Sequence, residues 1–322
     1  MNNAGEGGGA QAGSRIMFSQ LRPPSLPGFI QGELMHFYQS KSILSATNGM
    51  NISRGCVHGC IYCDSRSKCY HIEHDFEDVC IKSNAPALLE DALTRKRKKC
   101  MIGTGAMSDP YIPLQENLAN IRACLEIIEK HGFGLAIQTK SDLILRDLDL
   151  LININKKAKC IVETTLTTFD EKLCKILEPN VCGTERRFEM LKIMRDNGIQ
   201  TVVWLCPFLP FINDTEENLR GLLEYCADAK VYGVLCWGIG MTLREGDREY
   251  YYAKLDEHFP GLKEVYQKKY GFIYTVTSDA NTALMKILHD ICAQHNILCD
   301  NDAVFAYMRT FEGKQNPQPE LF

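Results

Sequence analysis

The chain has 322 residues, which is long enough to bury a large core in one barrel. With 45% hydrophobic and 24% charged residues, its composition is that of an ordinary globular protein. A net charge of -4 and an isoelectric point near 6.1 exclude the overall basic character of many nucleic-acid-binding proteins, although they leave a local basic patch open. The 15 cysteines are an odd, scattered set rather than a disulfide framework, and no apolar run approaches the ~20 residues that cross a bilayer, so we expect a cytoplasmic protein without membrane contact.

The beginning of the chain shows no charged segment followed by an apolar one, so no secretory leader is expected. Residues 1–15 are rich in Gly, Asn and Ala and contain almost no large apolar residue. Because such a segment cannot offset the entropy of ordering, it is expected to be a disordered tail. Residues 16–48 are then a lead-in to the folded part.

Short apolar segments alternate with amphipathic ones from residue 49 onward. Helices are predicted from Asn84 to about Lys99, over the periodic residues before Gly132, and from Thr184 to Asn197. Strands are predicted at residues 49–54, 101–105, 134–139, 159–166, 200–206 and 232–239. Strands that alternate with helices pair in parallel through right-handed crossovers, which favours an open partial barrel without excluding a flat sheet. Residues 49–240 form this unit, and residues 241–322 form a mainly helical extension that includes the periodic stretch 283–294.

Three cysteines, Cys56, Cys60 and Cys63, follow the first predicted strand with the spacing C-x3-C-x2-C. A cubane iron-sulfur cluster has four irons, so one short loop with three thiolates leaves the fourth iron open for chemistry. Gly55 and Gly59 mark a tight loop, which argues against three ordinary buried thiols. The spacing therefore favours a [4Fe-4S] site.

Zinc is the alternative metal for this loop. Structural zinc takes four protein ligands and catalytic zinc takes three plus water. Zinc would therefore recruit a further donor from His58, Cys69, His71 or His74, which stand at irregular spacing. This ligand count makes zinc the weaker alternative.

The run from Arg54 to Cys63 resembles the signature of the radical S-adenosylmethionine (SAM) superfamily, with Tyr62 at its aromatic position. The resemblance implies an α/β fold, a TIM-like partial (β/α)6 barrel whose cluster loop follows the first strand. It also implies that the three cysteines hold a [4Fe-4S] cluster, that SAM binds the open iron, and that a flavodoxin or ferredoxin supplies one electron. Reductive cleavage of SAM then gives a 5′-deoxyadenosyl radical, which abstracts hydrogen from a substrate.

Within the superfamily, the chain resembles the spore photoproduct lyase-like branch, also described as DNA repair photolyase-like, from about residue 44 to 300. The short motifs that carry this likeness are residues 105–109 (GAMSD), 138–140 (QTK) and 178–180 (EPN). Residues 203–214 and 242–248 look like hallmarks of a subgroup distinct from the lyase itself.

The resemblance assigns SAM contacts at the carboxyl ends of the strands, where barrel enzymes build their sites. Gly105, Ser108 and Asp109 follow the second strand, in the segment that contacts the SAM amino group in the family. Lys140 follows the third strand, where the SAM carboxylate would lie; an ordinary surface lysine is the alternative.

The fourth strand ends with an unusual density of hydroxyl groups and one carboxylate in a segment expected to be buried on both faces. Ribose hydroxyls would satisfy Glu163, Thr164 and Thr167, which makes them candidate SAM contacts. The high β-propensity of threonine explains these residues about as well.

Candidate substrate contacts come from the later strands and the loop beyond them. Arg244 and Arg248 lie in a loop that would bind a phosphate or carboxylate, unless they pair with neighbouring acidic residues. The basic run at residues 95–99 precedes a strand, so we expect it to be a solvated helix end, far from the site. The remaining candidates, which could also be core residues, are Trp204, Cys206, Cys236 and Trp237.

The chain departs from the lyase at two positions. Ala106 stands where the lyase has the cysteine that returns a hydrogen atom to the product radical, and Asp64 stands where it has one of two tyrosines. Another thiol would have to donate this hydrogen atom, and the candidates are Cys69, Cys206 and Cys236. The predicted catalytic residues are Tyr62, Cys69, Asp109 and Arg244.

Three functions therefore remain open at the level of sequence. The first is a radical SAM enzyme that acts on a base or lesion in DNA or RNA, which rests on family analogy. The second keeps the chemistry and places a small metabolite or peptide against the Arg244 loop. The third is a non-catalytic metal-binding scaffold.

Overall fold

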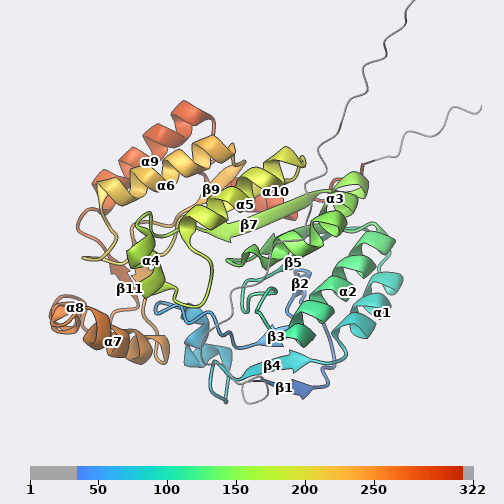
Figure 1. The fold of residues 1–322 in the computed structure, drawn as a ribbon, viewed down its shortest axis with the longest axis horizontal. Helices are drawn as coiled ribbons and strands as arrows, with labels where there is room; N and C mark the ends of the chain where they lie inside the picture. Colours follow the sequence, from blue (N-terminus) through green and yellow to red (C-terminus); the bar gives the residue numbers. More distant parts are fainter. Residues whose placement is uncertain (1–34, 315–322) are drawn as a thin grey trace, which may run out of the picture.

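The computed structural model describes residues 35–314, so the predicted tail at residues 1–15 and most of the lead-in lie outside the described residues. Its main sheet has six strands, all parallel, whose spatial order from one edge to the other is the order in the chain. They are β2 (Gly49–Met50), β5 (Met101–Thr104), β6 (Gly134–Gln138), β7 (Cys160–Thr165), β8 (Gln200–Trp204) and β9 (Gly233–Leu235). Four of them, β2, β5, β7 and β9, are labelled in Figure 1. This open, sequentially ordered sheet confirms the partial barrel.

Helices cover the outer face of the sheet. They are α1 (Ala85–Arg95), α2 (Gln115–His131), α3 (Leu148–Lys157), α5 (Thr184–Asp196) and α6 (Glu216–Ala229). The end of α2 was predicted correctly, since Gly132 takes the left-handed conformation with φ of 63°. The end predicted for α1 was wrong: the helix stops at Arg95, because Lys96 is already extended and the chain must turn to begin β5 at Met101.

The predicted first strand, residues 49–54, is divided between two sheets. Only β2 belongs to the barrel, whereas β3 (Ser53–Arg54) pairs antiparallel with β4 (Val79–Lys82), which pairs in parallel with β1 (Met35–Tyr38). The alternation of apolar residues does not reveal which neighbour a strand will pair with, so the sequence missed this three-stranded sheet. The predicted sixth strand, residues 232–239, was also too long, since β9 ends at Leu235.

The C-terminal part is mainly helical, as predicted. It contains the antiparallel pair β10 (Gly240–Thr242) and β11 (Thr275–Thr277), and the helices α7 (Asp247–His258), α8 (Leu262–Tyr270), α9 (Asn281–His295) and α10 (Asn301–Arg309). Helix α9 packs on α6, and the pair forms the upper left part of Figure 1. Helix α10 instead packs on the inner face of the sheet, where Val304 and Met308 join Met101, Ile161 and Leu235 in one core cluster.

Two 3-10 helices, η1 (Asp64–Arg66) and η2 (Lys68–Tyr70), follow the three-cysteine loop directly, and a third, η3 (Asp142–Asp147), follows β6. The short helix α4 (Glu171–Leu177) lies between β7 and α5 in the chain. Within residues 35–314, no helix is both long enough and apolar enough to span a bilayer.

Candidate functional site

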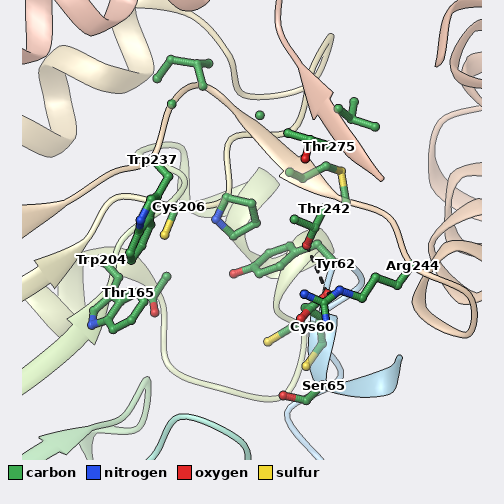
Figure 2. Close-up of a pocket in the computed structure, with 18 of the residues that line it drawn as sticks. Cys60, Tyr62, Ser65, Thr165, Trp204, Cys206, Trp237, Thr242, Arg244 and Thr275 are labelled. Carbon is green, nitrogen blue, oxygen red and sulfur yellow. Dashed lines mark hydrogen bonds and ion pairs between the residues drawn. The ribbon is translucent and has the colours of Figure 1, made fainter. Parts of the chain in front are cut away.

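A cavity of about 780 Å³ opens at the carboxyl ends of the parallel strands. Gln138, Thr165 and Trp204, the last residues of β6, β7 and β8, all line it. In Figure 2, Cys60, Tyr62 and Arg244 lie on one side of the cavity, and Trp204 and Trp237 lie on the other. This is the end of the barrel at which the site was predicted.

Two of the three loop cysteines, Cys60 and Cys63, line the cavity, and Cys56 is half-buried beside them. Burial raises the pKa of the Cys60 thiol to about 12, against the opposing effect of Lys140. Burial also raises the pKa of Cys56, and the nearby Asp109 and Cys60 raise it further. Buried thiols whose pKa is raised need a nearby cation to carry thiolate charge.

The spacing of these thiols bears on the choice between zinc and a cluster. Among the residues that the structure describes, the groups of three potential ligand atoms within 4.8 Å of one another do not include Cys56, Cys60 and Cys63. Ligands 2.3 Å from one tetrahedral zinc lie roughly 3.8 Å apart. A cubane, in which each thiolate binds a separate iron, suits the wider spacing.

The cysteine loop rests on residues 178–180. Asn180 donates from Nδ2 to the Val57 carbonyl (2.9 Å) and from its backbone to the His58 carbonyl (3.1 Å). Gly59 has φ of +71°, and a Cβ there would lie 3.1 Å from Asn180 Nδ2. The positive φ therefore favours glycine, and the close approach of the two segments adds to that preference.

A buried charge pair lies next to this support. Arg187 and Glu178 form an ion pair with fully buried side chains, and the Tyr62 hydroxyl donates to the same carboxylate. Burial alone would raise the pKa of Glu178, but Arg187 and Lys140 outweigh it and hold the pKa below its usual value. Burial and the charge of Glu178 raise the pKa of Tyr62 well above its usual value, so the phenol keeps its proton.

Lys140 lines the cavity beside the cysteine loop. Its ammonium lies 5.8 Å from the centre of the Tyr62 ring. Burial lowers the pKa of Lys140, but the electrostatic effects of Cys60 and Glu178 outweigh burial and leave the pKa above its usual value. The side chain therefore stays a cation at the wall of the cavity.

Asp109 fixes the backbone on which Lys140 stands. Its carboxylate accepts hydrogen bonds from Thr139 Oγ1 (2.6 Å) and from the Lys140 backbone N–H (2.9 Å), and it lies 3.5 Å from His58 Nδ1. It does not line the cavity. Asp109 thus joins the cysteine loop to the loop after β6 and fixes the backbone at Lys140.

Gly105 and Ser108 have structural roles in the loop after β5. Gly105 has φ of +102°, and a Cβ there would lie 2.0 Å from the Gln138 carbonyl oxygen. Ser108 donates its hydroxyl hydrogen to the Gly55 carbonyl (2.7 Å) and lies 2.9 Å from Ser53 Oγ. The next residue after Gly105, Ala106, is the one that reaches the cavity.

The fourth-strand candidates separate according to the pleat of β7. Glu163 and Thr165 face the barrel interior, where Thr165 lines the cavity and Glu163 accepts a hydrogen bond from Trp204 Nε1 (2.8 Å). Thr164 points to the other face, and its buried hydroxyl has no hydrogen-bond partner among the described residues. Thr167 lies beyond the strand, with its carbonyl bound by Asn213 and Asn218. The structure therefore does not bring Thr164 and Thr167 to the cavity.

Three aromatic side chains form the wall opposite the cysteines. The rings of Trp204 and Trp237 are 5.4 Å apart, and Phe305 of α10 lies 5.9 Å from Trp204 and 5.8 Å from Trp237. Trp237 is 58% exposed, which is unusual for so large an apolar side chain. Glu163 accepts a hydrogen bond from the indole N–H of Trp204, which fixes the orientation of this ring in the wall.

Arg244 reaches the cavity from the loop after β10, as predicted. It donates to the Tyr274 hydroxyl and to Cys69 Sγ (3.1 Å), and its Nε lies 3.5 Å from Asp64 Oδ1. Arg248 instead donates to the carbonyls of Leu243, Phe272 and Ile273, away from the cavity. The guanidinium of Arg244 is thus held by neutral and acidic groups at the rim.

The three candidate thiols differ in their access to the cavity. Cys206 lines it, whereas Cys69 is exposed outside the lining and Cys236 is buried with its thiol donating to the Gly238 carbonyl (3.6 Å). Burial raises the pKa of Cys206 to about 12. A neutral thiol therefore faces the cavity from the end of β8 (Figure 2).

Sequence reasoning did not predict the supporting role of the Glu178–Arg187 pair or of Phe305. The EPN motif at residues 178–180 was a signal for the first, because it stood out without an assigned task. Nothing local in α10 distinguishes Phe305, which reaches the cavity only because that helix packs inside the barrel.

Comparison with known proteins agrees with this architecture. The chain is 29% identical to an uncharacterised protein of Methanocaldococcus jannaschii, over 72% of this chain and 84% of that protein. A variant of spore photoproduct lyase has a similar structure, with a TM-score of 0.60 at 13% identity over 82% of this chain and 80% of that chain. Another lyase variant, with bound AdoMet and dinucleoside spore photoproduct, gives a TM-score of 0.54 at 14% identity over 77% of this chain and 72% of that chain. At these identities the structural likeness concerns the fold alone.

The family model of the radical SAM superfamily matches residues 50–224, which is more than half of the chain and contains the three-cysteine loop, Lys140 and the barrel strands β5 to β8. The chain therefore belongs to the radical SAM superfamily.

Proposed function

We propose that this protein is a radical SAM enzyme in which Cys56, Cys60 and Cys63 bind a [4Fe-4S] cluster and the cavity holds SAM and an aromatic substrate. The observation that carries the proposal is that Cys60, Cys63 and Lys140 open onto one cavity whose opposite wall carries Trp204 and Trp237. When bound, the reduced cluster supplies an electron that cleaves SAM into methionine and a 5′-deoxyadenosyl radical.

The residues of the chain hold SAM in this proposal. Lys140 binds the methionine carboxylate, because it is a buried cation beside the cysteine loop with no other hydrogen-bond partner for its ammonium among the described residues. Gly105 allows the loop after β5 to pack against the Gln138 carbonyl, which leaves Ala106 facing the ligand, and Asp109 keeps the Lys140 backbone in place. Tyr62, whose hydroxyl donates a hydrogen bond to Glu178, forms the cavity wall next to the cysteines and Lys140.

Cys206 is the proposed hydrogen donor to the substrate radical, in place of the solvent-exposed Cys69. Its pKa of about 12 keeps the S–H bond intact at neutral pH. The substrate radical would take the thiol hydrogen atom, and the sulfur radical left on Cys206 would return to the thiol by taking one electron from the external donor and a proton from water.

A nucleobase is the substrate class that the cavity favours. The indoles of Trp204 and Trp237 offer apolar faces of the kind on which bases stack, and Arg244 at the rim suits a phosphate. Structures of the lyase with a dinucleoside lesion point in the same direction. If so, DNA or RNA binding weakens steeply with salt, because phosphate contacts release counterions.

A small metabolite or peptide remains the second candidate. The cavity volume of about 780 Å³ lies within the range usual for small-molecule sites, roughly 300–1,000 Å³. Oligonucleotide affinity that is absent, or unchanged between low and high salt, selects this candidate over the first.

The decisive experiment is anaerobic reconstitution with iron and sulfide, reduction by dithionite or flavodoxin, and quantification of 5′-deoxyadenosine and of the EPR spectrum with and without SAM. The wild type is expected to form the product and to show a SAM-dependent spectrum, whereas Cys56→Ala/Cys60→Ala/Cys63→Ala does neither. Cys100→Ala/Cys299→Ala, which removes half-buried thiols outside the cavity, is the matched control and should behave as wild type. A cluster that ignores SAM would favour the scaffold alternative.

Deuterium tests the role of Cys206 without a known substrate. In D2O, a Cys206 S–D bond facing the cavity is expected to deliver deuterium to 5′-deoxyadenosine during uncoupled SAM cleavage. Cys206→Ala should lower that incorporation several-fold at an unchanged cleavage rate, and Cys69→Ala should not. Equal incorporation in all three proteins would exclude Cys206 as the donor.

A further inference from the structure

We propose that His36, His74 and Cys80 form a second metal site, for zinc, on the three-stranded sheet outside the barrel. Within residues 35–314, these side chains are the group whose three ligand atoms all lie within 4.8 Å of one another. Neither the family assignment nor the proposed reaction involves them.

The fold brings two of the three ligands together by strand register. His36 on β1 and Cys80 on β4 are direct partners in the parallel pairing, so their side chains lie on the same face of the sheet. His74 precedes β4 and packs its ring edge-on against His36, with the ring centres 4.9 Å apart and the planes at 89°.

The hydrogen bonds of both histidines leave one nitrogen available for a metal. His36 Nδ1 lies 3.1 Å from each carboxylate oxygen of Asp78, and His74 Nδ1 lies 2.9 Å from the Asp75 carbonyl oxygen. Because these partners only accept hydrogen bonds, each Nδ1 carries the proton and each Nε2 keeps its lone pair. Metal-binding histidines are oriented in this way by a carboxylate or a backbone carbonyl.

The donor set selects the metal. Two imidazoles and one thiolate suit zinc rather than magnesium or calcium, which prefer oxygen. Tetrahedral zinc needs ligand atoms roughly 3.3–3.8 Å apart, and the three ligand atoms here lie within 4.8 Å of one another. Three protein donors leave the fourth position for water.

The site has a structural consequence for the cysteine loop. Cys80 pairs with Arg54 in the β3–β4 ladder, and the Phe76 carbonyl accepts a hydrogen bond from the Cys56 backbone (2.8 Å). A Cβ at Gly55 would lie 2.4 Å from that same carbonyl oxygen. A metal bound by His74, Cys80 and His36 of β1 would therefore stiffen residues 74–80, the segment that contacts the beginning of the cysteine loop at Gly55 and Cys56.

The test measures zinc on the full chain with its cluster reconstituted, so that the loop thiols are occupied. The wild type is expected to retain one zinc per chain after gel filtration, and His74→Gln and Cys80→Ser should each lose at least ten-fold in zinc affinity, with iron content unchanged. His71→Gln, at an exposed histidine three residues from His74, is the matched control and should keep zinc. Cobalt in place of zinc should give a thiolate charge-transfer band that disappears in Cys80→Ser.

Two further measurements keep the result independent of cluster chemistry and of folding. Zinc retained by the Cys56→Ala/Cys60→Ala/Cys63→Ala variant places it outside the loop. Because Cys80 is buried, circular dichroism must show that Cys80→Ser is folded. If that variant is unfolded, the comparison uses His74→Gln instead, since His74 is only half-buried. A wild type that takes up no zinc, or equal zinc affinity in His74→Gln, overturns the proposal.

Discussion

Glu163 is a carboxyl group in the barrel interior, and its surroundings set its protonation. The side chain is 4% exposed and is bound by Trp204 Nε1, a neutral donor. Burial raises its pKa to about 7, although the hydrogen bond from Trp204 works in the opposite direction. A group of this kind makes the stability of the protein depend on pH, and it holds the aromatic wall of the cavity in place.

Replacing Glu163 by glutamine should remove that pH dependence. The unfolded chain loses the proton near its ordinary pKa of 4.5 and the folded chain near 7, so the folded state binds more protons between these values and its free energy of unfolding falls as pH rises. The difference amounts to about 3 kcal/mol, present below pH 4.5 and lost above pH 7. Urea unfolding of wild type and Glu163→Gln between pH 4 and 8 measures it, and parallel pH profiles would contradict the assignment.

Lys140 should contribute mainly to SAM binding. Removing a charged hydrogen-bond partner costs about 1.5–3 kcal/mol, so Lys140→Ala should weaken SAM binding by roughly 10- to 150-fold. Equilibrium dialysis with the reconstituted protein measures the affinity, and Lys172→Ala on the exposed face of α4 is the control. An unchanged SAM affinity in Lys140→Ala would show that Lys140 does not bind SAM.

At the scale of elements, the cysteine loop depends on a segment more than 100 residues away in the chain. Ile61 donates to the Leu177 carbonyl (3.0 Å), and Asn180 binds two carbonyls of the loop. Gly59 and residues 178–180 are therefore two sides of one contact. The sequence contains both partners, but their spacing in the chain does not reveal that they meet.

Asn180→Ala should loosen the loop without removing a thiol. The Val57 carbonyl is buried and would lose its side-chain donor, at a cost of about 1–3 kcal/mol. We expect the variant to lose iron several-fold faster after dilution, as measured by the decay of the cluster absorption. Asn197→Ala removes a comparable side-chain hydrogen bond, to the Ile193 carbonyl, on an exposed helix end and should decay at the wild-type rate.

At the scale of the whole molecule, α10 joins the C-terminal part to the barrel. Val304, Phe305 and Met308 pack on residues from the inner faces of five barrel strands, and the Lys159 ammonium at the start of β7 binds the Tyr307 carbonyl (2.6 Å). Packing therefore continues across residue 240, the predicted boundary between the barrel and the extension. We expect the two parts to unfold together.

Met308→Ala tests this coupling. A buried methionine replaced by alanine costs about 2–4 kcal/mol, and here the loss should lower the unfolding transition of the whole chain. Tryptophan fluorescence reports Trp204 and Trp237 of the barrel together with their contact to Phe305, and far-ultraviolet circular dichroism reports the helices of both parts; the two signals should shift together. Asp302→Ala on the exposed side of α10 should change the free energy of unfolding by no more than about 0.5 kcal/mol. Two separate transitions would show that the extension folds independently.

The amino-acid sequence by itself determined the six barrel strands to within a few residues at most ends, the helix end at Gly132, and the three-cysteine loop. Each of these depends on local signals: apolar runs of strand length, a glycine free to adopt positive φ, and thiols at fixed spacing. Position after a strand also placed Lys140 and Arg244 correctly at the cavity end of the barrel, because parallel strands end on one side.

Only the tertiary structure decided which of the remaining candidates face the cavity. The pleat turns Glu163 and Thr165 to the barrel interior, where Thr165 lines the cavity and Glu163 does not, and it turns Thr164 to the other face, a one-residue difference that composition does not reveal. The division of residues 49–54 between two sheets, the contact of residues 178–180 with the cysteine loop, and the place of Phe305 inside the barrel all depend on pairings between distant segments. Such pairings are set by the packing of the whole chain, since local sequence fixes the type of an element but not its neighbour.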